Sequence, residues 1–547
     1  MPLSREQKIV QGHEALKQRK GTFEESLEDI SFYVLPEYEN QDEVSEGDDY
    51  PSRPCSSVAT NASIKLGGNL YSFTYQHGQR NFSLRSMEQD ADDQMESWLQ
   101  NATNVANEAI QNSNFSEAYG EMCHLMSTFG TGSLSIEYNP TRKELFFRNH
   151  PINGNLFLIE DSYGVINGFS REIVYTSTAA IEAYGAENLP VDIVEAANDP
   201  SRIAETFTFI HQVTKNPKYD PSKINSKQMP FLSTHVTMDD PTIIKESGFR
   251  TNPMVFPRFI KVRNFPYGYG SGHLALPSIR QINQAEDDYI KAIEMEAFPT
   301  TFVSDDEAAE TAEIAPRAIN YVDMTQGPPV QMKIGGNSRT LLERIVQLGG
   351  QIKEQFFIDV FLSLSQRYNT GRTATEVNEI TEEKLSSIGP MVSRLRSECW
   401  SPMIERIIQL LIDNGQIPVP PGEMESNFRV VYTSRIDSQL ASIRANETLR
   451  AANEAAGLLA LKAQSPELAT VVRLEDAAER LLKDRNLDRD FLITKRERES
   501  IQEAQAAAMQ AEKEQQQAAA QIAPIDPNKA PQPGSIVDQL NNLGPQI

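Results

Sequence analysis

Two long amphipathic segments, at about 275–298 and 339–365, enclose a short insertion at 299–338 that contains proline and β-like stretches. As a helix, the first segment would be about 36 Å long, because each residue adds about 1.5 Å. The second segment carries apolar residues along one side and starts near Asn337, Ser338 or Thr340. Thr340 with Glu343 is a candidate capping box. Its apolar positions are Leu341, Leu342, Ile345, Leu348, Ile352, Phe356 and Val360. The pattern predicts a helical hairpin whose tip is presented to partners.

The chain before the hairpin changes character near residue 130. Helical periodicity marks residues 4–35 and the stretches SSVATNASIKLGGNLYSF and ADDQMESWLQNATNVANEAIQNSNFSEAYGEMCHLMSTFG. From about 130 to 264, short β-branched and aromatic runs alternate with turn signals such as Asn153-Gly154 and Asn167-Gly168, which predicts an antiparallel meander. Because helical and β regions are separate along the chain, the expected fold class is α+β.

After the hairpin, Thr373 with Glu376 resembles a second capping box, and the helical pattern that follows stops at Asn414-Gly415. Good helix formers fill residues 436–500, and residues 501–521 form an Ala/Gln-rich, helix-prone segment. The last stretch, 522–547, has too much proline and too little apolar content to pack, so we expect it to be disordered.

Composition excludes several classes of protein. No run approaches the ~18 consecutive apolar residues of a membrane span, so no membrane partner is expected. The three cysteines are far apart and odd in number, which argues against a disulfide framework or a zinc cluster. The formal net charge of -25 speaks against a surface that holds nucleic acid by neutralising phosphates. It is compatible with a surface past which nucleic acid slides without sticking.

Three alternating glycines, Gly268, Gly270 and Gly272, precede the first long helix and raise the question of a phosphate site. The position three residues after Gly270 is His273, so the dinucleotide fingerprint fails, and no Gly-Lys-Ser/Thr occurs anywhere. The favoured interpretation is a flexible connector that leads into a helix. With no His-Glu-x-x-His, Cys-x-x-Cys or Gly-x-Ser-x-Gly motif either, we expect no catalytic residue, cofactor or metal.

Between Glu286 and Glu313 there are ten acidic residues and one basic residue, Lys291, which gives a net charge of -9. One interpretation is an ordinary solvated helix face. The other is an anionic lining that, multiplied around a ring, would repel phosphates. The acidic residues are Glu286, Asp287, Asp288, Glu294, Glu296, Asp305, Asp306, Glu307, Glu310 and Glu313.

Several stretches resemble, in family order, the head-to-tail connecting (portal) proteins of short-tailed bacteriophages. They include SSVATNASIKLGGNLYSFTY, SNFSEAYGEMCHLMSTFGTGSLSIE, RNHPINGNLFLIEDSYGVINGFSREIVYTSTAAIEAYG and FPYGYGSGHLALPSIRQIN. The most specific is FFIDVFLSLSQRYNTGRTATEVNEITEEKLSSIGPMVSRLRSECWSPMIERIIQLLIDNG, where a polar loop, a helix start and a Gly-Pro kink coincide. The resemblance covers about residues 5–500. After Tyr75 the sequence Gln-His-Gly-Gln-Arg departs from the usual Pro-containing turn of the family.

The resemblance implies a closed ring of about twelve copies at one capsid vertex. It also implies a name for each segment: a wing at 1–270, with wing return helices at 376–435; a first stem helix at 271–298; a clip at 299–338; a second stem helix at 339–365; a tunnel loop at 366–375; and a crown at 436–500. The wing–stem hinge would be Gly268, Gly270 and Gly272, where a ring that changes shape needs backbone freedom.

Roles for individual residues follow from the same resemblance. Glu286, Asp287, Asp288, Glu294 and Glu296 would line the channel, and Asp305, Asp306, Glu307, Glu310 and Glu313 would meet the packaging motor. The tunnel-loop residues Arg367, Asn369, Thr370, Gly371 and Arg372 could touch passing DNA, or the two arginines could form intersubunit ion pairs.

The implied partners are other copies of the chain, the capsid and scaffolding proteins, the terminase ATPase, a tail adaptor and double-stranded DNA. The implied location is the virion, after assembly in the host cytoplasm. Two alternatives stay open. One is a metal-dependent enzyme acting on nucleic acid through Asp287, Asp288, Asp305 and Asp306, and the other is a different structural ring or scaffold protein.

Overall fold

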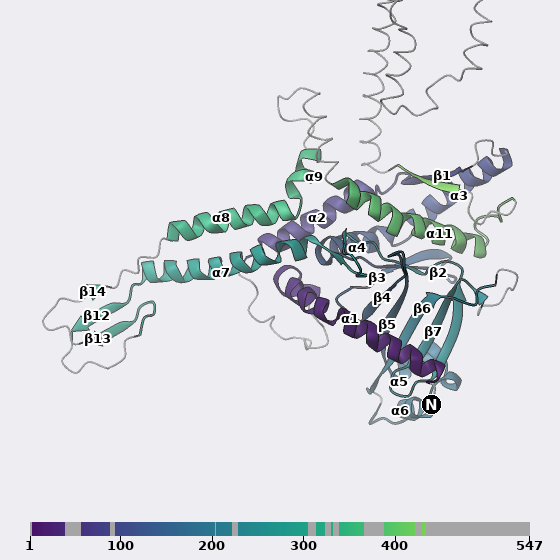
Figure 1. The fold of residues 1–547 in the computed structure, drawn as a ribbon, viewed down its shortest axis with the longest axis horizontal. Coiled ribbons are helices and arrows are strands. Elements are labelled where there is room, and N and C mark those ends of the chain that lie inside the picture. The colour runs from purple at the N-terminus through teal and green to yellow at the C-terminus, as the bar shows by residue number, and fades with distance from the viewer. Residues whose placement is uncertain are drawn as a thin grey trace, which may run out of the picture. The chain divides into compact units, whose positions relative to one another are not determined.

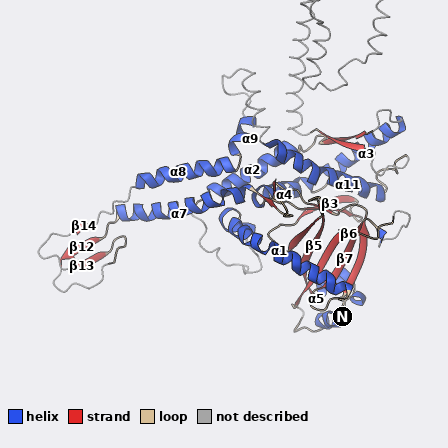
Figure 2. Ribbon diagram, in the orientation of Figure 1, coloured by secondary structure: helices blue, strands red, loops and turns tan. Residues whose placement is uncertain are grey.

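A computed structural model describes residues 3–38, 56–87, 93–202, 204–220, 228–304, 313–322, 330–331, 338–365, 388–421 and 428–433. These residues belong to the first of two compact units, Met1–Ala441, and the second unit, Ser442–Ile547, lies outside the described residues. The predicted crown, the Ala/Gln-rich helix and the disordered tail therefore stay predictions. The described part mixes helices and strands, which confirms the α+β fold class (Figure 2).

The first described element is the single long helix α1 (Arg5–Val34), where the periodicity of residues 4–35 predicted one or two helices. The Ser4 side chain accepts a hydrogen bond from the backbone N–H of Gln7, and the Gln7 side chain accepts one from the Ser4 backbone, so both residues cap the first turn. Phe23, Leu27, Ile30 and Val34 recur at helical spacing and are all buried. This stripe holds α1 against the wing body beside strand β4 (Figure 1).

A helical layer follows α1. Its helices and their attached short elements are η1 (Pro36–Tyr38), α2 (Val58–Thr74), α3 (Asp93–Gln111) and α4 (Phe115–Phe129). Helices α2 and α4 pack so closely that Gly67 of α2 lies directly against the Cα of His124 in α4. A cluster of buried aromatic rings, made of Tyr75, Phe115, Tyr119 and Trp400, joins this layer to the returning chain.

The predicted β region forms two antiparallel sheets. The first has the order β3-β2-β9, with β2 (Leu134–Asn139), β3 (Glu144–Asn149) and β9 (Met254–Val255). The second has the order β4-β5-β6-β7-β8, with β4 (Leu156–Glu160), β5 (Ile166–Thr176), β6 (Thr206–Lys215), β7 (Phe231–Thr237) and β8 (Ile243–Phe249). Helices α5 (Ser177–Tyr184) and α6 (Val191–Asn198) and the short η2 (Ala186–Asn188) pack at one end of it. The meander is confirmed.

One predicted turn is wrong. Asn153-Gly154 does lie in a turn, with the Gly154 N–H donating to the Pro151 carbonyl. Asn167-Gly168, however, lies inside strand β5, and the turn between β4 and β5 is formed by residues 161–164. Gly168 packs against the Val213 carbonyl of the neighbouring strand, so its lack of a side chain serves close packing between strands.

The predicted hairpin is present. A two-stranded ribbon of β10 (Ile260–Lys261) and β11 (Gly268–Tyr269) leads into α7 (Ser271–Ala297), and α8 (Ser338–Gln355) runs back beside it (Figure 1). We call α7 and α8 the stem. The second long helix was predicted as unbroken to residue 365, which is wrong. It ends at Gln355, Phe357 takes a left-handed φ of 55°, and α9 (Ile358–Ser365) starts afresh.

The insertion between the stem helices contains three short strands in the order β13-β12-β14: β12 (Thr301–Ser304), β13 (Ile319–Val322) and β14 (Val330–Gln331). This agrees with the partly β-like pattern of the sequence. In the returning chain, a helix at 388–395 continues through a π-helical turn, η4 (Arg396–Trp400), into α11 (Ser401–Asp413), which stops at Asn414-Gly415 as predicted.

Strand pairing between the chain's early and late parts was not predicted. β15 (Phe428–Tyr432) pairs antiparallel with β1 (Phe82–Ser86), and the two strands lie over three hundred positions apart in the sequence. Among the described residues, no helix is both long and apolar enough to cross a membrane.

Candidate functional site: an acidic stem on a glycine-packed junction

The first stem helix, α7, carries five acidic and two basic residues, whereas α8 carries two acidic and three basic ones. On α7 the charged side chains find partners about one helical turn away. Lys291 Nζ donates to Asp287 Oδ2 at 2.5 Å, and Gln284 Nε2 donates to Asp288 Oδ1 at 3.0 Å. The acidic character therefore lies on a solvated helix whose charges interact locally.

The remaining predicted channel residues lie on the same helix. Glu286 is half-buried and Glu294 is exposed. Glu296 is exposed near the end of α7, where its Oε2 accepts a hydrogen bond from Ser338 Oγ at 3.2 Å. Because Ser338 is the first residue of α8, this bond holds the start of α8 beside the end of α7. All five predicted residues are thus on one helix, although they do not converge on one point.

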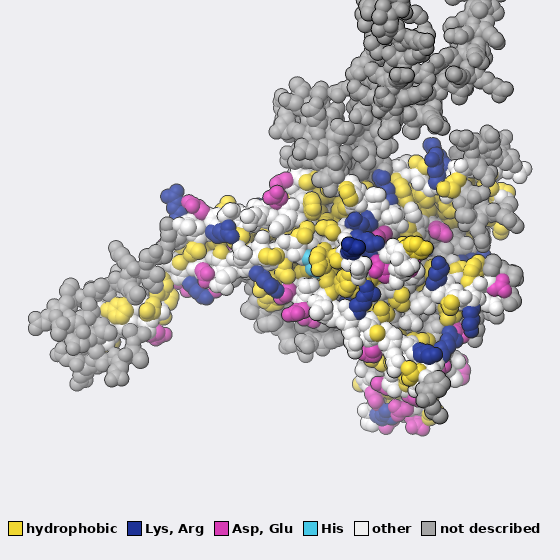
Figure 3. Space-filling view, in the orientation of Figure 1, with side chains coloured by type: hydrophobic (Ala, Val, Ile, Leu, Met, Phe, Trp, Pro, Cys, Tyr) yellow, Lys and Arg dark blue, Asp and Glu magenta, His cyan; other side chains and the backbone are white. Residues whose placement is uncertain are grey.

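Apolar side chains between these charges are exposed. Ile290 and Ile293 of α7 are more than a third exposed, and Val346 of α8 is 69% exposed. By contrast, Ile279, Ile282, Leu348 and Ile352 near the base are buried between the two helices. Figure 3 shows hydrophobic side chains alternating with charged ones along this part of the stem. A soluble protein rarely keeps such a row of apolar groups in water without a partner.

The base of the stem is a junction where backbones come close together. A Cβ on Gly268 would lie 2.5 Å from the Gly130 carbonyl oxygen, and one on Gly272 would lie 2.7 Å from that of Thr128. A Cβ on Gly270 would overlap the same Thr128 carbonyl. All three predicted hinge glycines are buried. The reason for glycine here is close packing, since real Cβ contacts are never this short. A hinge motion at this place stays a prediction.

Gly130 is the other half of this contact. It ends α4 with a left-handed φ of 89°, and a Cβ there would overlap the Gly268 carbonyl. Its carbonyl accepts from Phe259 N–H at 2.8 Å, and the adjacent Thr131 hydroxyl accepts from Gly268 N–H at 2.8 Å. This pairing could not be predicted from the sequence, because Gly130 and Gly268 are far apart along the chain.

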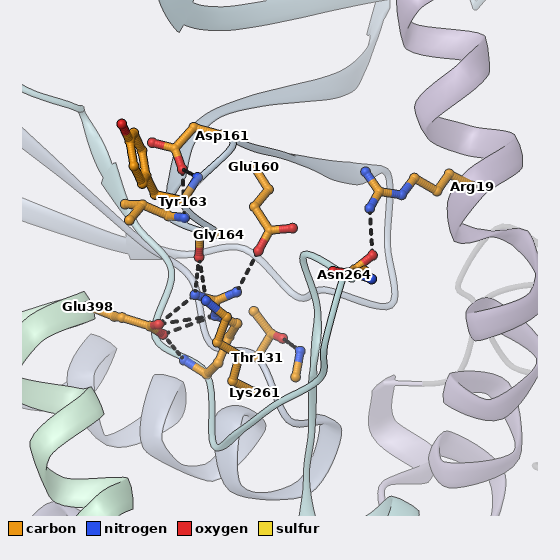
Figure 4. A network of polar contacts seen from close by, with 12 residues as sticks. Arg19, Thr131, Glu160, Asp161, Tyr163, Gly164, Lys261, Asn264 and Glu398 are labelled. Carbon is orange, nitrogen blue, oxygen red and sulfur yellow. Dashed lines mark hydrogen bonds and ion pairs between the residues drawn. The ribbon is translucent and has the colours of Figure 1, made fainter.

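A buried arginine joins this junction to strand β4 and to the return helix, and Figure 4 labels three of its partners, Glu160, Gly164 and Glu398. Arg258 is only 2% exposed, and its Nη2 donates to Glu398 Oε1 at 2.6 Å and to the Gly164 carbonyl at 3.0 Å. Its Nη1 donates to Glu160 Oε1 at 3.3 Å, and its backbone N–H donates to Glu398 Oε2 at 2.9 Å. Glu398 lies in the π-helical turn, so one cation joins β4, the junction and the return helix.

Sequence reasoning missed Arg258 and Glu398 because each is a single charged residue in an unremarkable context.

His273, at the start of α7, was noted only as breaking a motif. Its Nδ1 accepts from the Gly270 N–H at 3.3 Å, and burial lowers its pKa to about 4. It is therefore neutral at pH 7 and helps to cap the stem helix.

Several predicted residues cannot be placed. The tunnel loop at 366–375, with Arg367, Asn369, Thr370, Gly371 and Arg372, lies outside the described residues, as do Asp305, Asp306, Glu307 and Glu310. Glu313 is described. Its backbone N–H donates to Asn320 Oδ1 at 2.7 Å, and its carbonyl accepts from Asn320 Nδ2 at 2.7 Å, so it anchors β13.

Comparisons with known proteins point in one direction. The model of a family described as "Bacteriophage head to tail connecting protein" matches residues 6–492. A "Probable portal protein" of Bordetella phage BPP-1 is 26% identical over 362 residues, which is 65% of this chain and 65% of that protein. The "Portal protein" of Salmonella phage epsilon15 is 22% identical over 511 residues, which is 91% of this chain and 90% of that protein.

Proposed function

The chain belongs to the family of bacteriophage head-to-tail connecting proteins, the phage portal proteins, and we propose that it acts as a closed ring at one vertex of the head. Double-stranded DNA would enter through the ring during packaging and leave through it during ejection. A ring of about twelve copies requires head-to-tail contacts that close on themselves. As a head-to-tail connecting protein it is a component of the virion, and we propose that it assembles in the host cytoplasm.

The observation that carries the channel proposal is the acidic helix α7 in a protein of net charge -25. DNA carries about one negative charge per 1.7 Å of helix axis, so a ring of such helices would repel the duplex and keep it from adhering. We propose Glu286, Asp287, Asp288, Glu294 and Glu296 as the acidic residues nearest to the DNA. The exposed apolar residues of the stem support the ring, because packing between neighbouring stems would cover them.

Other segments take their proposed roles from the family. The tip of the stem, with Asp305, Asp306, Glu307, Glu310 and Glu313, would bind the terminase ATPase during packaging and the tail adaptor afterwards. The tunnel loop at 366–375 would contact DNA transiently. The wing, with its two sheets, would face the capsid and scaffolding proteins. Energy for DNA movement would come from the separate ATPase, and no enzymatic step is proposed for this chain.

Of the four aspartates of the metal-enzyme alternative, Asp305 and Asp306 lie outside the described residues, and the geometry of the other two does not favour it. Adjacent residues on a helix point about 100° apart. Asp287 accordingly bonds to Lys291 toward the helix C-terminus, whereas Asp288 accepts from Gln284 toward the N-terminus. The two carboxylates therefore do not form one ligand set, and among the described residues there is no cluster of three or more metal-ligating side chains.

Native mass spectrometry with negative-stain imaging of the purified protein tests the proposal. We expect a closed ring of about twelve copies of the 61.2 kDa chain, with an axial hole wide enough for duplex DNA. A monomer or dimer that persists at high concentration and across salt conditions would refute the ring. A ring that binds duplex DNA tightly at low salt would refute the repulsive channel and leave the ring intact.

A further inference from the structure

The turn between β4 and β5 is held by an unusual number of hydrogen bonds. Asp161 Oδ1 accepts from the N–H groups of Tyr163 at 2.9 Å and Val165 at 3.0 Å. Asp161 N–H donates to the Val165 carbonyl at 2.9 Å, and Gly164 N–H donates to the Asp161 carbonyl at 3.1 Å. We call residues 161–165 the tethered turn, because these bonds leave its backbone little freedom.

Two cations from the junction hold the same turn from outside. The Gly164 carbonyl accepts from Arg258 Nη2 at 3.0 Å and from Lys261 Nζ at 2.8 Å (Figure 4). Gly164 has a left-handed φ of 75°, and a Cβ there would lie 2.5 Å from Lys261 Nζ. The turn is thus fixed both internally and to the β10–β11 ribbon.

Beside the exposed Ser162, the turn presents two large and mainly apolar side chains to solvent. Tyr163 is 88% exposed and Val165 is 56% exposed. The hydrogen bonds that fix this turn therefore hold Tyr163 and Val165 out in water. Tyrosine on a rigid backbone is the usual anchor of a protein interface, because little conformational entropy is lost on binding.

The surroundings of the tethered turn are basic. Lys261 and Arg263 lie on and just after β10, both exposed, and the exposed Arg19 of α1 donates to the Asn264 carbonyl at 3.0 Å. No acidic residue occurs between Phe249 and Gln284 in the sequence. The turn itself carries the half-buried Asp161, but the exposed charged residues beside it are basic. On a chain of net charge -25, these basic residues are electrostatically complementary to other parts of the same chain.

We propose that the tethered turn and its basic surroundings bind a second copy of this chain, through an acidic stripe on the C-terminal half of α1. That stripe consists of Glu25, Glu28, Asp29 and Phe32, which recur at helical spacing. Between Gly21 and Tyr38 there are five acidic residues and no basic one. Glu25 and Glu28 are exposed and Phe32 is half-buried, so the stripe offers both charge and apolar area.

The positions of the two surfaces suit a ring, and in this respect the inference rests on the proposed function. Rotation about a ring axis leaves the height of every atom along that axis unchanged, so surfaces that meet must lie at similar heights. Both surfaces lie at the wing–stem junction. The turn is bonded to Lys261 beside β11, and the stripe is bonded to α7 by the ion pair between Asp29 and Arg280. They are different surfaces, as a heterologous contact requires.

Site-specific cross-linking tests the contact directly. In a Cys55→Ser background, where Cys123 and Cys399 are buried, we would combine Tyr163→Cys with Glu28→Cys and oxidise the assembled ring. The expected result is a ladder of covalent multimers on a non-reducing gel, because a disulfide needs Cβ atoms within about 4.5 Å. Each single-cysteine variant is a control and should run as a monomer on the same gel. A ring that gives no ladder would overturn the pairing of these surfaces.

Charge exchange provides a second test. Arg263→Glu should raise the concentration at which half of the chains assemble by about tenfold or more, and so should Tyr163→Ser, as for the loss of an interface hot spot. Adding Glu28→Lys to Arg263→Glu should restore assembly. Arg142→Glu, on the exposed turn between β2 and β3, is the matched charge control.

The outcomes separate the two proposals. If the unmodified protein forms no ring, the proposed function fails. If it forms a ring that Tyr163→Ser and Arg263→Glu leave unchanged, the ring stands and this contact is wrong. Tyr163 is so exposed that its replacement should leave the folded monomer intact, which circular dichroism can verify.

Discussion

The stem and its junction with the wing are neighbours in the chain but are held together by different means. In the stem, one apolar stripe on each helix makes the contact, and Lys291 and Arg339 pair with residues about one turn away on their own helix. Glu296 and Arg344 bond across to Ser338 and Gln281 of the neighbouring stem helix. At the junction, backbones meet at glycines, and the buried Arg258 joins residues that are 98 and 140 positions away. A substitution should therefore be tolerated in the stem and costly at the junction.

Replacing Arg258 should have the largest effect. Arg258→Met removes the cation between Glu398 and Glu160 and leaves two partly buried carboxylates facing each other, which should cost about 3–5 kcal/mol of unfolding free energy. Urea unfolding of the purified protein measures this. Arg142→Met breaks an exposed ion pair with Glu144 and should change stability by less than about 0.5 kcal/mol. Equal effects of the two changes would mean that the junction is not specially held.

Gly130→Ala should be nearly as damaging. The new Cβ would overlap the Gly268 carbonyl, and alanine disfavours the left-handed φ of 89°, so we expect a loss of about 3 kcal/mol. The matched change in the stem is Gly350→Ala, where nothing lies within 4 Å of the added Cβ. Because alanine is the better helix former, that variant should gain about 1 kcal/mol. Thermal unfolding of both variants compares the two regions directly, and a gain at both positions would contradict the close-packed junction.

Lowering the pH should reduce the stability of the wing but not that of the stem beyond its base. Burial lowers the pKa of His150 and of His235 to about 4, with Arg171 adding to the effect on both. Protonation of a histidine whose folded pKa lies below its unfolded value of about 6.5 favours the unfolded chain. The folded protein therefore loses stability as the pH falls from 6.5 toward 4, by up to about 3 kcal/mol for each such histidine. All seven histidines lie between His13 and His273, so none is on the stem past its first turn.

Hydrogen exchange followed by mass spectrometry at pH 7 and pH 5 would resolve this difference. After correction for the intrinsic exchange rate, strands β6 and β7 should lose protection at pH 5 and α8 should not. The double variant His150→Phe with His235→Phe should reduce the pH dependence in the strands. Part of it should remain, because burial also lowers the pKa of His211 on β6 well below its usual value. Equal loss of protection in α8 would show that another group controls the response.

The smallest effect is expected from Lys291→Ala. Its ion pair with Asp287 is exposed and local, and pairs of this kind contribute about 0.3–0.5 kcal/mol at most. The unfolding midpoint should hardly move, and added salt should shrink the small difference, because salt screens an exposed ion pair. A loss above about 1 kcal/mol would mean that the stem charges contribute more to the fold than local pairing allows.

How far the sequence could predict these regions follows the range of the contacts. The two stem helices, α1 and the β region were predictable because a helix or strand repeats its burial pattern every few residues. The break at Phe357 was not, since Phe356 is drawn into the core where α8 meets the wing, and nothing local marks it. The turn at Asn167-Gly168 was predicted wrongly because the dipeptide rule ignores the bonds that Asp161 makes instead.

The candidate site shows the same division. The acidic residues of α7 could be found by counting charges, and the family resemblance, which the comparisons confirm, supplied the function. The glycines before α7 were found, but the reason for them was not, because their close contacts are with Thr128 and Gly130 on another helix. Arg258, Glu398 and the tethered turn had no signal that a single sequence can carry.

By itself, the sequence determined the acidic character of the stem, the hairpin and the order of helical and β regions, because composition and periodicity are properties of neighbouring residues. Only the tertiary structure decided which glycines touch, which arginine is buried and which turn holds a tyrosine in solvent. Those features depend on distances between residues far apart in the chain, and such distances exist only once the chain has folded.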